Sequence, residues 1–239
     1  MMKIKRLMAL GSVVAAMLSA VTVSANENLN GDMTIEEGGT AFVETSEIRR
    51  LRMFKEMELA NRLLQDPVNY VSDEGYIILD VTPFQQENGY YCGPATVKQV
   101  LHFINGVSYS QDYYADLLGT TEDGTNMTYI PDVLNSEIGY DYYIYDEIDS
   151  YEEWSSKISQ GLLNEMPPVL DINTYGYWDD FFYETSGHFV NVCIDDPITT
   201  DGDGYYFWIT DPAHGDRKMI EKTTLFQVNY QHFRRAFIW

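Results

Sequence analysis

The chain has 239 residues, enough for one or two domains, and 45% of them are hydrophobic, so it can bury a core and fold. It carries 37 acidic and 15 basic residues, a formal charge of −22, and this acidity excludes a nucleic-acid binder, which needs a basic surface. Two cysteines are too few for a disulfide-dense scaffold or a four-thiolate zinc site.

Residues 1–25 have the pattern of a secretory signal peptide. Three basic residues precede an apolar stretch over residues 7–23, and small side chains at positions 23 and 25 suit a cleavage site. Cleavage removes three positive charges and leaves a mature chain of charge −25. The alternative is an uncleaved membrane anchor, but the apolar stretch is short for a span of about 20 residues. We expect a secreted, extracellular protein with no membrane attachment after signal removal.

Two segments precede the main domain. Residues 26–45 are polar and acidic and predict a flexible lead-in. Residues 46–75 predict an N-terminal helical segment, whose helix ends at Asp66-Pro67. This helix is either packed on the domain or is a removable prosegment that shields a site. The apolar residues that mark its one helical face are Met53, Met57, Ala60 and Leu64.

Residues 76–239 predict a single domain in which helices precede antiparallel strands. A first strand over 76–81 leads into the Gln85-Gln86 loop. Helices are then predicted over 92–105, 111–118, 129–135 and 151–166, and strands over 169–172, 188–194, 205–210 and 235–239. This order, without regular βαβ alternation, indicates an α+β fold.

Cys92 is a candidate nucleophile because it stands at the start of a predicted helix. Pro94 suits the first turn of that helix. Free N–H groups and the positive end of the helix dipole favour a thiolate at this place and can receive an oxyanion. A structural strand-to-helix corner uses the same small residues, so Cys92 alone does not establish an active site.

Acyl transfer by a thiolate also needs a base, a group that orients the base, and a donor for the developing oxyanion. His188 follows Gly187 at the start of an apolar strand, which would hold its imidazole at a sheet end. Asp211 ends the next strand, so its carboxylate can reach the far nitrogen of His188. Gln86 lies six residues before Cys92, near enough for its amide to act beside the Cys92 N–H.

Three runs of sequence together carry a family resemblance: QENGYYCGPA over 86–95, GHFV over 187–190, and the later Asp211-Pro212. With the middle region over 110–135, they resemble the C39-like cysteine peptidases, which have a papain-like fold. The resemblance covers about 76–239. It implies Cys92 as nucleophile, His188 as base, Asp211 as its orienter and Gln86 as oxyanion donor. The best-known members are domains of bacteriocin exporters that cut leaders after Gly-Gly. This chain has neither their transmembrane bundle nor their nucleotide-binding motif, so their substrate is not implied.

Other residues compete for these roles. His102 lies about ten residues, or 15 Å, along the helix from Cys92, which is too far for a base, so we expect a packing or surface role. His214 is an alternative base, and His232 is expected to be a surface residue. Asp195 is the rival of Asp211, but it falls where the hairpin turns away from His188.

Three further features of the sequence each have two interpretations. Strand alternation points Cys193 away from His188, which favours a buried free thiol over a disulfide with Cys92. Residues 201–204 resemble half a calcium loop but lack its spacing, so a solvated turn is expected. The aromatic residues over 175–183 either line a groove for a peptide or glycan or belong to the core.

The sequence therefore predicts a secreted cysteine peptidase that acts on peptide or protein substrates without a metal or organic cofactor. Two alternatives remain open. One is a non-catalytic extracellular binding module on a peptidase-like fold, and the other is a thiol acyltransferase.

Overall fold

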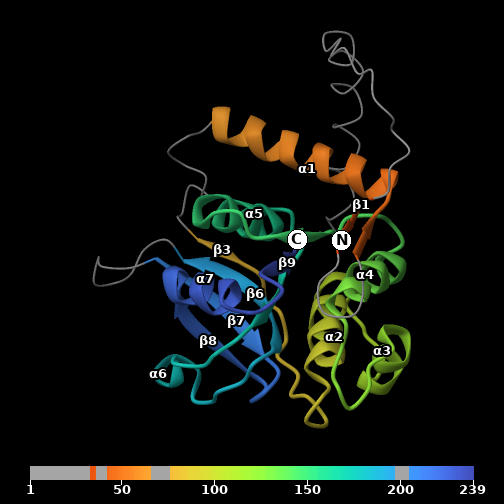
Figure 1. The fold of residues 1–239 in the computed structure, drawn as a ribbon, viewed down its shortest axis with the longest axis vertical. Helices are drawn as coiled ribbons and strands as arrows, with labels where there is room; N and C mark the ends of the chain where they lie inside the picture. The colour runs from red at the N-terminus through yellow and green to blue at the C-terminus, as the bar shows by residue number, and fades with distance from the viewer. Residues whose placement is uncertain (1–32, 36–41, 66–75, 197–204) are drawn as a thin grey trace.

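The computed structural model describes residues 33–35, 42–65, 76–196 and 205–239 (Figure 1). The predicted signal peptide at 1–25 and the 201–204 run lie outside these ranges. So does most of the predicted lead-in, but its described parts form two short antiparallel strands that the sequence did not predict, β1 (Met33–Ile35) and β2 (Phe42–Glu44). Within the described ranges, no helix combines the length and the apolarity needed to cross a bilayer.

The helix α1 (Ser46–Gln65) forms where it was predicted, but its apolar stripe faces solvent. Met53, Met57 and Leu64 are 56%, 60% and 81% exposed, whereas Lys55 and Leu59 are buried. The sequence indicated one apolar helical face, and the structure buries the opposite face of α1.

Buried charges explain why the opposite face of α1 is the packed one. Arg52 forms an ion pair with Asp146, and the Lys55 ammonium lies 3.8 Å and 4.2 Å from the ring centroids of Tyr142 and Trp239. Charged stems and paired heads can thus replace apolar side chains in an interface. In Figure 1, α1 lies at the opposite end of the molecule from the yellow loop that precedes α2, so it does not cover that loop.

A seven-stranded antiparallel sheet forms the centre of the molecule. The order of its main strands is β4-β9-β5-β6-β7-β8, and β3 pairs with the far end of β6. The predicted strand over 76–81 is reduced to β3, and β4 and β8 were not predicted. The strands are β3 (Ile77–Ile78), β4 (Tyr145–Glu147), β5 (Val169–Ile172), β6 (His188–Asp196), β7 (Tyr206–Asp211), β8 (Asp216–Glu221) and β9 (Ala236–Ile238).

Helices cover both faces of this sheet, which confirms the predicted α+β fold (Figure 1). The predicted helices are present with small changes in their ends, whereas α6 and α7 were not predicted. A short 3-10 helix, η3, precedes α4. The helices are α2 (Cys92–Asn105), α3 (Gln111–Leu118), η3 (Met127–Tyr129), α4 (Ile130–Ile138), α5 (Tyr151–Leu163), α6 (Trp178–Phe181) and α7 (Lys222–Tyr230).

Two hydrophobic cores lie on the two sides of the sheet. One contains Trp154 of α5 and Val228 of α7. The other contains Val97 and Leu101 of α2, with the helices α3 and α4 around them. The central strands therefore carry side chains into both cores, and α2 packs directly on the strands that hold His188 and Asp211.

Candidate active site

Cys92 is the first residue of α2, and its side chain is partly exposed. Tyr91 at the N-cap makes no side-chain capping hydrogen bond, so the helix end stays open to an anion. A Cβ atom on Gly93 would overlap with Oγ1 of Thr125, so only glycine fits directly after the cysteine. The sequence therefore places a thiol, without a competing cap, at an open helix N-terminus.

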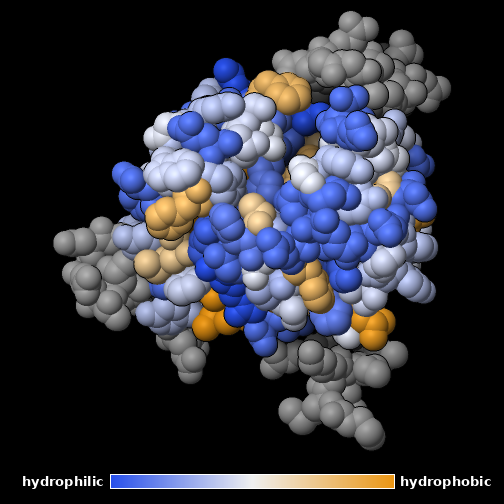
Figure 2. Space-filling model, turned by 90° about the horizontal axis from the view of Figure 1, so that it is seen from below, coloured by the Kyte–Doolittle hydropathy of each residue, from blue (hydrophilic) through white to orange (hydrophobic). Residues whose placement is uncertain are grey.

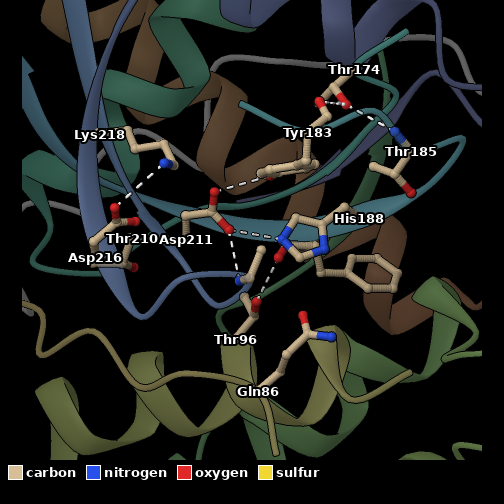
Figure 3. Close-up of polar contacts among 12 residues, drawn as sticks. Gln86, Thr96, Thr174, Tyr183, Thr185, His188, Thr210, Asp211, Asp216 and Lys218 are labelled. Atoms are coloured by element: carbon tan, nitrogen blue, oxygen red, sulfur yellow. Dashed lines mark hydrogen bonds and ion pairs between the residues drawn. The ribbon is translucent and has the colours of Figure 1, made fainter. Parts of the chain in front are cut away.

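His188 begins β6 and lies between two partners. Its Nε2 atom is 2.9 Å from Oδ1 of Asp211 (Figure 3). Its imidazole also interacts with the side chain of Cys92, which favours the protonated ring. Because Nε2 faces Asp211, Nδ1 is the ring nitrogen left for the sulfur. The structure thus brings together three of the four predicted residues in the order sulfur, imidazole, carboxylate.

The surroundings of His188 favour its protonated form. Burial disfavours the charged ring, but the hydrogen bond to Asp211 and the interactions with Cys92 and with the Asp211 charge outweigh it and raise the pKa of His188 from 6.5 to about 10. An imidazolium next to the cysteine sulfur is the state that stabilises a thiolate.

Asp211 ends β7 and is fully buried. Its Oδ1 accepts hydrogen bonds from His188 and from the Ala213 N–H at 2.9 Å, and its Oδ2 accepts one from the Tyr183 hydroxyl at 3.0 Å (Figure 3). Burial opposes ionisation, but these hydrogen bonds, with the charge of His188, hold the pKa of Asp211 below its ordinary value. The carboxylate is therefore an ionised and fixed partner of the imidazole.

Gln86 lies on the loop between β3 and α2. Its backbone N–H donates to the Pro212 carbonyl at 2.8 Å, which ties this loop to the turn after Asp211. Its Nε2 donates to the Asn88 carbonyl at 2.7 Å, and its second Nε2 hydrogen remains for another acceptor. In Figure 3 the amide end of Gln86 points toward the His188–Asp211 pair. This placement suits the predicted oxyanion donor.

Gln111 holds the Gln86 loop from the other side. Its Nε2 donates to the Gln85 carbonyl at 2.7 Å, and its Oε1 accepts from the Glu87 N–H at 3.0 Å. Gln111 is buried at the first residue of α3. A single side-chain amide thus fixes the backbone on both sides of Gln86.

Gln99 joins the elements that carry the site. It is fully buried on α2, and its Nε2 donates to the Phe84 carbonyl at 2.9 Å. Its Oε1 accepts from Asn191 of β6 at 2.7 Å and from Thr210 of β7 at 3.0 Å. Neither Gln99 nor Gln111 was recognised as a site-building residue from the sequence, because no local pattern shows which distant groups meet.

Two of the competing residues lie where the sequence predicted. His102 packs edge-on against Phe84 and its Nδ1 is 3.1 Å from Ser108 Oγ. Asp195 lies near the far end of β6, where its carboxylate pairs with Lys222 and accepts a hydrogen bond from Ser159. Asp195 is thus part of a structural ion pair and does not reach the imidazole of His188.

His214 was the alternative base, and Cys193 was predicted to be a buried free thiol. The exposed His214 ring lies 5.7 Å from the Tyr183 ring, so it flanks the site, and Asp211 pairs with His188. Cys193 is a buried free thiol, as predicted, and burial raises its pKa to about 12.

His232 was predicted to be a surface residue, and this is wrong. The side chain is 1% exposed and lies 3.4 Å from Oδ1 of Asp171 on β5. The turn after α7 folds it under Gly187, where a Cβ atom would come within 3.2 Å of the imidazole. Its sequence neighbours Phe233 and Arg234 remain accessible, which is why the local pattern suggested a surface position.

The aromatic segment over 175–183 contains both core and exposed side chains. Phe181 is buried in the core, whereas Tyr175, Trp178 and Phe182 are exposed, and their groove role stays a prediction. Tyr183 packs against the core, and its hydroxyl reaches Asp211. Within the described ranges, no group of three or more histidine, cysteine, aspartate or glutamate side chains is placed to hold a metal ion.

Comparisons with known proteins identify the family. The model of the Peptidase_C39 like family matches residues 78–237, which include all four candidate residues. Two solved structures are similar, each with a TM-score of 0.43. A double glycine motif protease from an AMS/PCAT transporter, in complex with the leader peptide, is 17% identical over 67% of this chain and 91% of that chain. The peptidase domain of Streptococcus ComA, a bi-functional ABC transporter involved in quorum sensing, is 16% identical over 66% and 96%. No curated protein matches the chain. The family model spans about two thirds of the sequence, and the chain belongs to the Peptidase C39-like family.

Proposed function

We propose that the protein is a secreted cysteine peptidase that hydrolyses peptide bonds with Cys92 as nucleophile. The observation that carries this proposal is that His188 is hydrogen-bonded to Asp211 and interacts with the side chain of Cys92, which begins α2. This arrangement favours a reactive cysteine over a structural one, because a structural cysteine needs no buried imidazole that is itself bound to an ionised carboxylate. Export is inferred from the leader pattern over residues 1–25.

Acylation begins with attack of the Cys92 sulfur on the substrate carbonyl carbon. The carbonyl oxygen becomes an oxyanion, and the Cys92 N–H and the remaining Nε2 hydrogen of Gln86 donate to it. The protonated His188 then gives its proton to the leaving amine, the C–N bond breaks, and a thioester to Cys92 remains. Asp211 keeps the His188 ring in one orientation through Nε2.

Deacylation uses the same residues in reverse. Neutral His188 takes a proton from water, the hydroxide oxygen attacks the thioester carbon, and the free acid leaves as the Cys92 sulfur is released. If an amine or thiol attacks in place of water, the acyl group is transferred to that amine or thiol.

The Gln86 loop lies at one end of the molecule. The surface at this end is mainly hydrophilic (Figure 2), which suits a site that admits water and polar peptide backbones.

The chain offers a matched control for the test, because it has two free cysteines. The mature chain, Cys92→Ala and Cys193→Ala are each incubated with a mixed peptide library, and new termini are identified by mass spectrometry. We expect Cys193→Ala to cleave like the parent and Cys92→Ala to lose cleavage by about 10³-fold or more. Iodoacetamide should label Cys92 and not the buried Cys193 in the folded parent.

The alternatives give different results in the same assay. Cleavage by Cys92→Ala at the parental rate would contradict the proposal. Labelling of Cys92 at the rate of an ordinary free thiol, without cleavage of any peptide, would indicate a binding module. Products joined to an added amine, in place of free acids, would indicate an acyltransferase.

A further inference from the structure

We propose that Tyr183 is a positioning residue of the active site, which fixes the Asp211 carboxylate and thereby the orientation of His188. This inference rests on the proposed peptidase function. Tyr183 donates through its hydroxyl to Asp211 and not to the sulfur. It acts through Asp211, because its hydroxyl is the partner of the carboxylate oxygen that does not face the imidazole.

The two carboxylate oxygens of Asp211 accept hydrogen bonds from different donors. Oδ1 accepts from His188 and from the Ala213 N–H, both at 2.9 Å, and Oδ2 accepts from Tyr183 at 3.0 Å. With both oxygens held, the carboxylate cannot rotate away from the ring. Since Asp211 is fully buried, Oδ2 would carry negative charge without a donor if the Tyr183 hydroxyl were removed.

The ring of Tyr183 also covers the His188–Asp211 pair. It meets the His188 ring edge-on, with 5.4 Å between centroids and 73° between planes, and it lies 5.7 Å from the exposed His214 ring. The phenol is therefore placed between the buried pair and an exposed side chain. Exclusion of water on this side strengthens the hydrogen bond between carboxylate and imidazole.

The chain is built to hold Tyr183 in this place. The Thr174 hydroxyl is fully buried, donates to the Tyr183 carbonyl at 3.0 Å and accepts from the Thr185 N–H at 3.0 Å (Figure 3). Thr174 N–H also donates to the Thr185 carbonyl at 3.0 Å. The preceding residue, Phe182, has φ +63° and a side chain that is 63% exposed. A non-glycine residue in this region is strained, and here it lets the next side chain turn inward.

The test compares Tyr183→Phe with Tyr113→Phe. Tyr113 makes a matched contact elsewhere, since its hydroxyl donates to Glu137 at 3.1 Å on the exposed surface of α3 and α4. For Tyr183→Phe we expect kcat to fall about tenfold, as for loss of a hydrogen bond to a charged group, with KM within about twofold. For Tyr113→Phe we expect both constants to stay within about twofold of the parent.

The pH profile separates positioning from a general loss of stability. Because the Tyr183 hydrogen bond helps to lower the pKa of Asp211, Tyr183→Phe should move the acid limb of kcat/KM to higher pH. A general loss of stability would lower the activity without moving this limb. The same shift is expected in the pH dependence of Cys92 alkylation, which needs no peptide substrate. If the parent cleaves no peptide, the peptidase proposal fails, while alkylation still decides the role of Tyr183.

Two results would overturn the inference. One is a Tyr183→Phe protein whose kcat and acid limb match those of Tyr113→Phe. If Tyr183→Phe does not fold, Thr174→Val replaces it, because it loosens the segment that holds Tyr183 without altering Asp211. We expect the acid limb of Thr174→Val to move to higher pH by a smaller amount. The second overturning result is a Thr174→Val protein with the parental kcat and an unmoved acid limb.

Discussion

Two buried histidine–aspartate pairs lie beside each other in this sheet, and they differ in what surrounds the histidine. His188 and Asp211 join the ends of β6 and β7, and His232 and Asp171 lie next to them under Gly187. The pKa of His188 is raised to about 10, whereas burial lowers the pKa of His232 and outweighs the attraction of Asp171.

Burial lowers the pKa of both rings, but His188 gains a hydrogen bond to Asp211 at 2.9 Å, whereas His232 lies 3.4 Å from Asp171. A third partner adds to the difference. Asp171 is also bound by Arg234 at 2.9 Å, so its charge is already balanced by a cation that disfavours a second one on His232. Among the described residues, the hydrogen bonds to Asp211 besides that of His188 come from two neutral donors, the Tyr183 hydroxyl and the Ala213 N–H, and Cys92 also raises the pKa of His188. Of the two buried pairs, the one whose carboxylate has no second cation is therefore the one that favours a protonated histidine.

The largest expected contrast comes from removing each histidine. His188→Ala should lower kcat by about 10³-fold, because the proton donor and acceptor of the reaction is lost. His232→Ala should leave kcat within about threefold and lower the free energy of unfolding by about 1–3 kcal/mol, because a buried partner of Asp171 is lost. Steady-state kinetics and urea unfolding of both variants measure the two effects. A large loss of kcat in a fully folded His232→Ala would break the comparison.

The two pairs should also respond to pH with opposite signs. The raised pKa of His188 means that its stabilising contribution is complete below about pH 6.5 and is lost as the pH rises through about 10. The lowered pKa of His232 means that its contribution is present above its ordinary value of 6.5 and is lost as the pH falls. Peptidase activity should decline near pH 10, when His188 loses its proton.

Urea unfolding between pH 5 and 10.5 measures both losses of stability. In His232→Ala the loss on the acidic side should shrink, while the loss on the alkaline side persists. An alkaline loss that survives in His188→Ala would show that another group causes it.

The smallest expected effect on activity comes from Arg234→Met, which keeps the apolar stem and removes the charge. The pKa of His232 should rise, because Arg234 no longer opposes its protonation and Asp171 still attracts the proton. The control is Arg235→Met, whose exposed guanidinium lies over the Tyr230 ring. An NMR titration of the histidines follows the shift, and kcat should stay within about twofold. An unmoved His232 titration would contradict the role given to Arg234.

The sequence predicted local features well. Helix α2 and strand β5 have the predicted ends, because their apolar periods are clear and Gly106, in a left-handed conformation, marks the end of α2. The motifs around Cys92 and His188 also predicted that each residue begins its element, and the structure places Cys92 first in α2 and His188 first in β6. The catalytic roles themselves stay predictions.

Long-range pairing of charges was beyond the sequence. The packed face of α1 carries Arg52 and Lys55. Its partners come about ninety residues later, because Arg52 pairs with Asp146 and Lys55 donates to the Tyr142 carbonyl. Strand β8 was missed because its charged side chains, such as those of Asp216 and Lys218, resemble those of a loop. In both places the missing information is the position of a distant partner.

The side-chain amide of Gln99 has a consequence for how the protein can vary. Separation of α2 from the sheet would break its hydrogen bonds to Phe84, Asn191 and Thr210 together. The spacing between Cys92 on α2 and His188 on β6 is thus maintained by the buried amide of Gln99. Exposed segments around Cys92 can then vary in sequence while Cys92 and His188 keep their places.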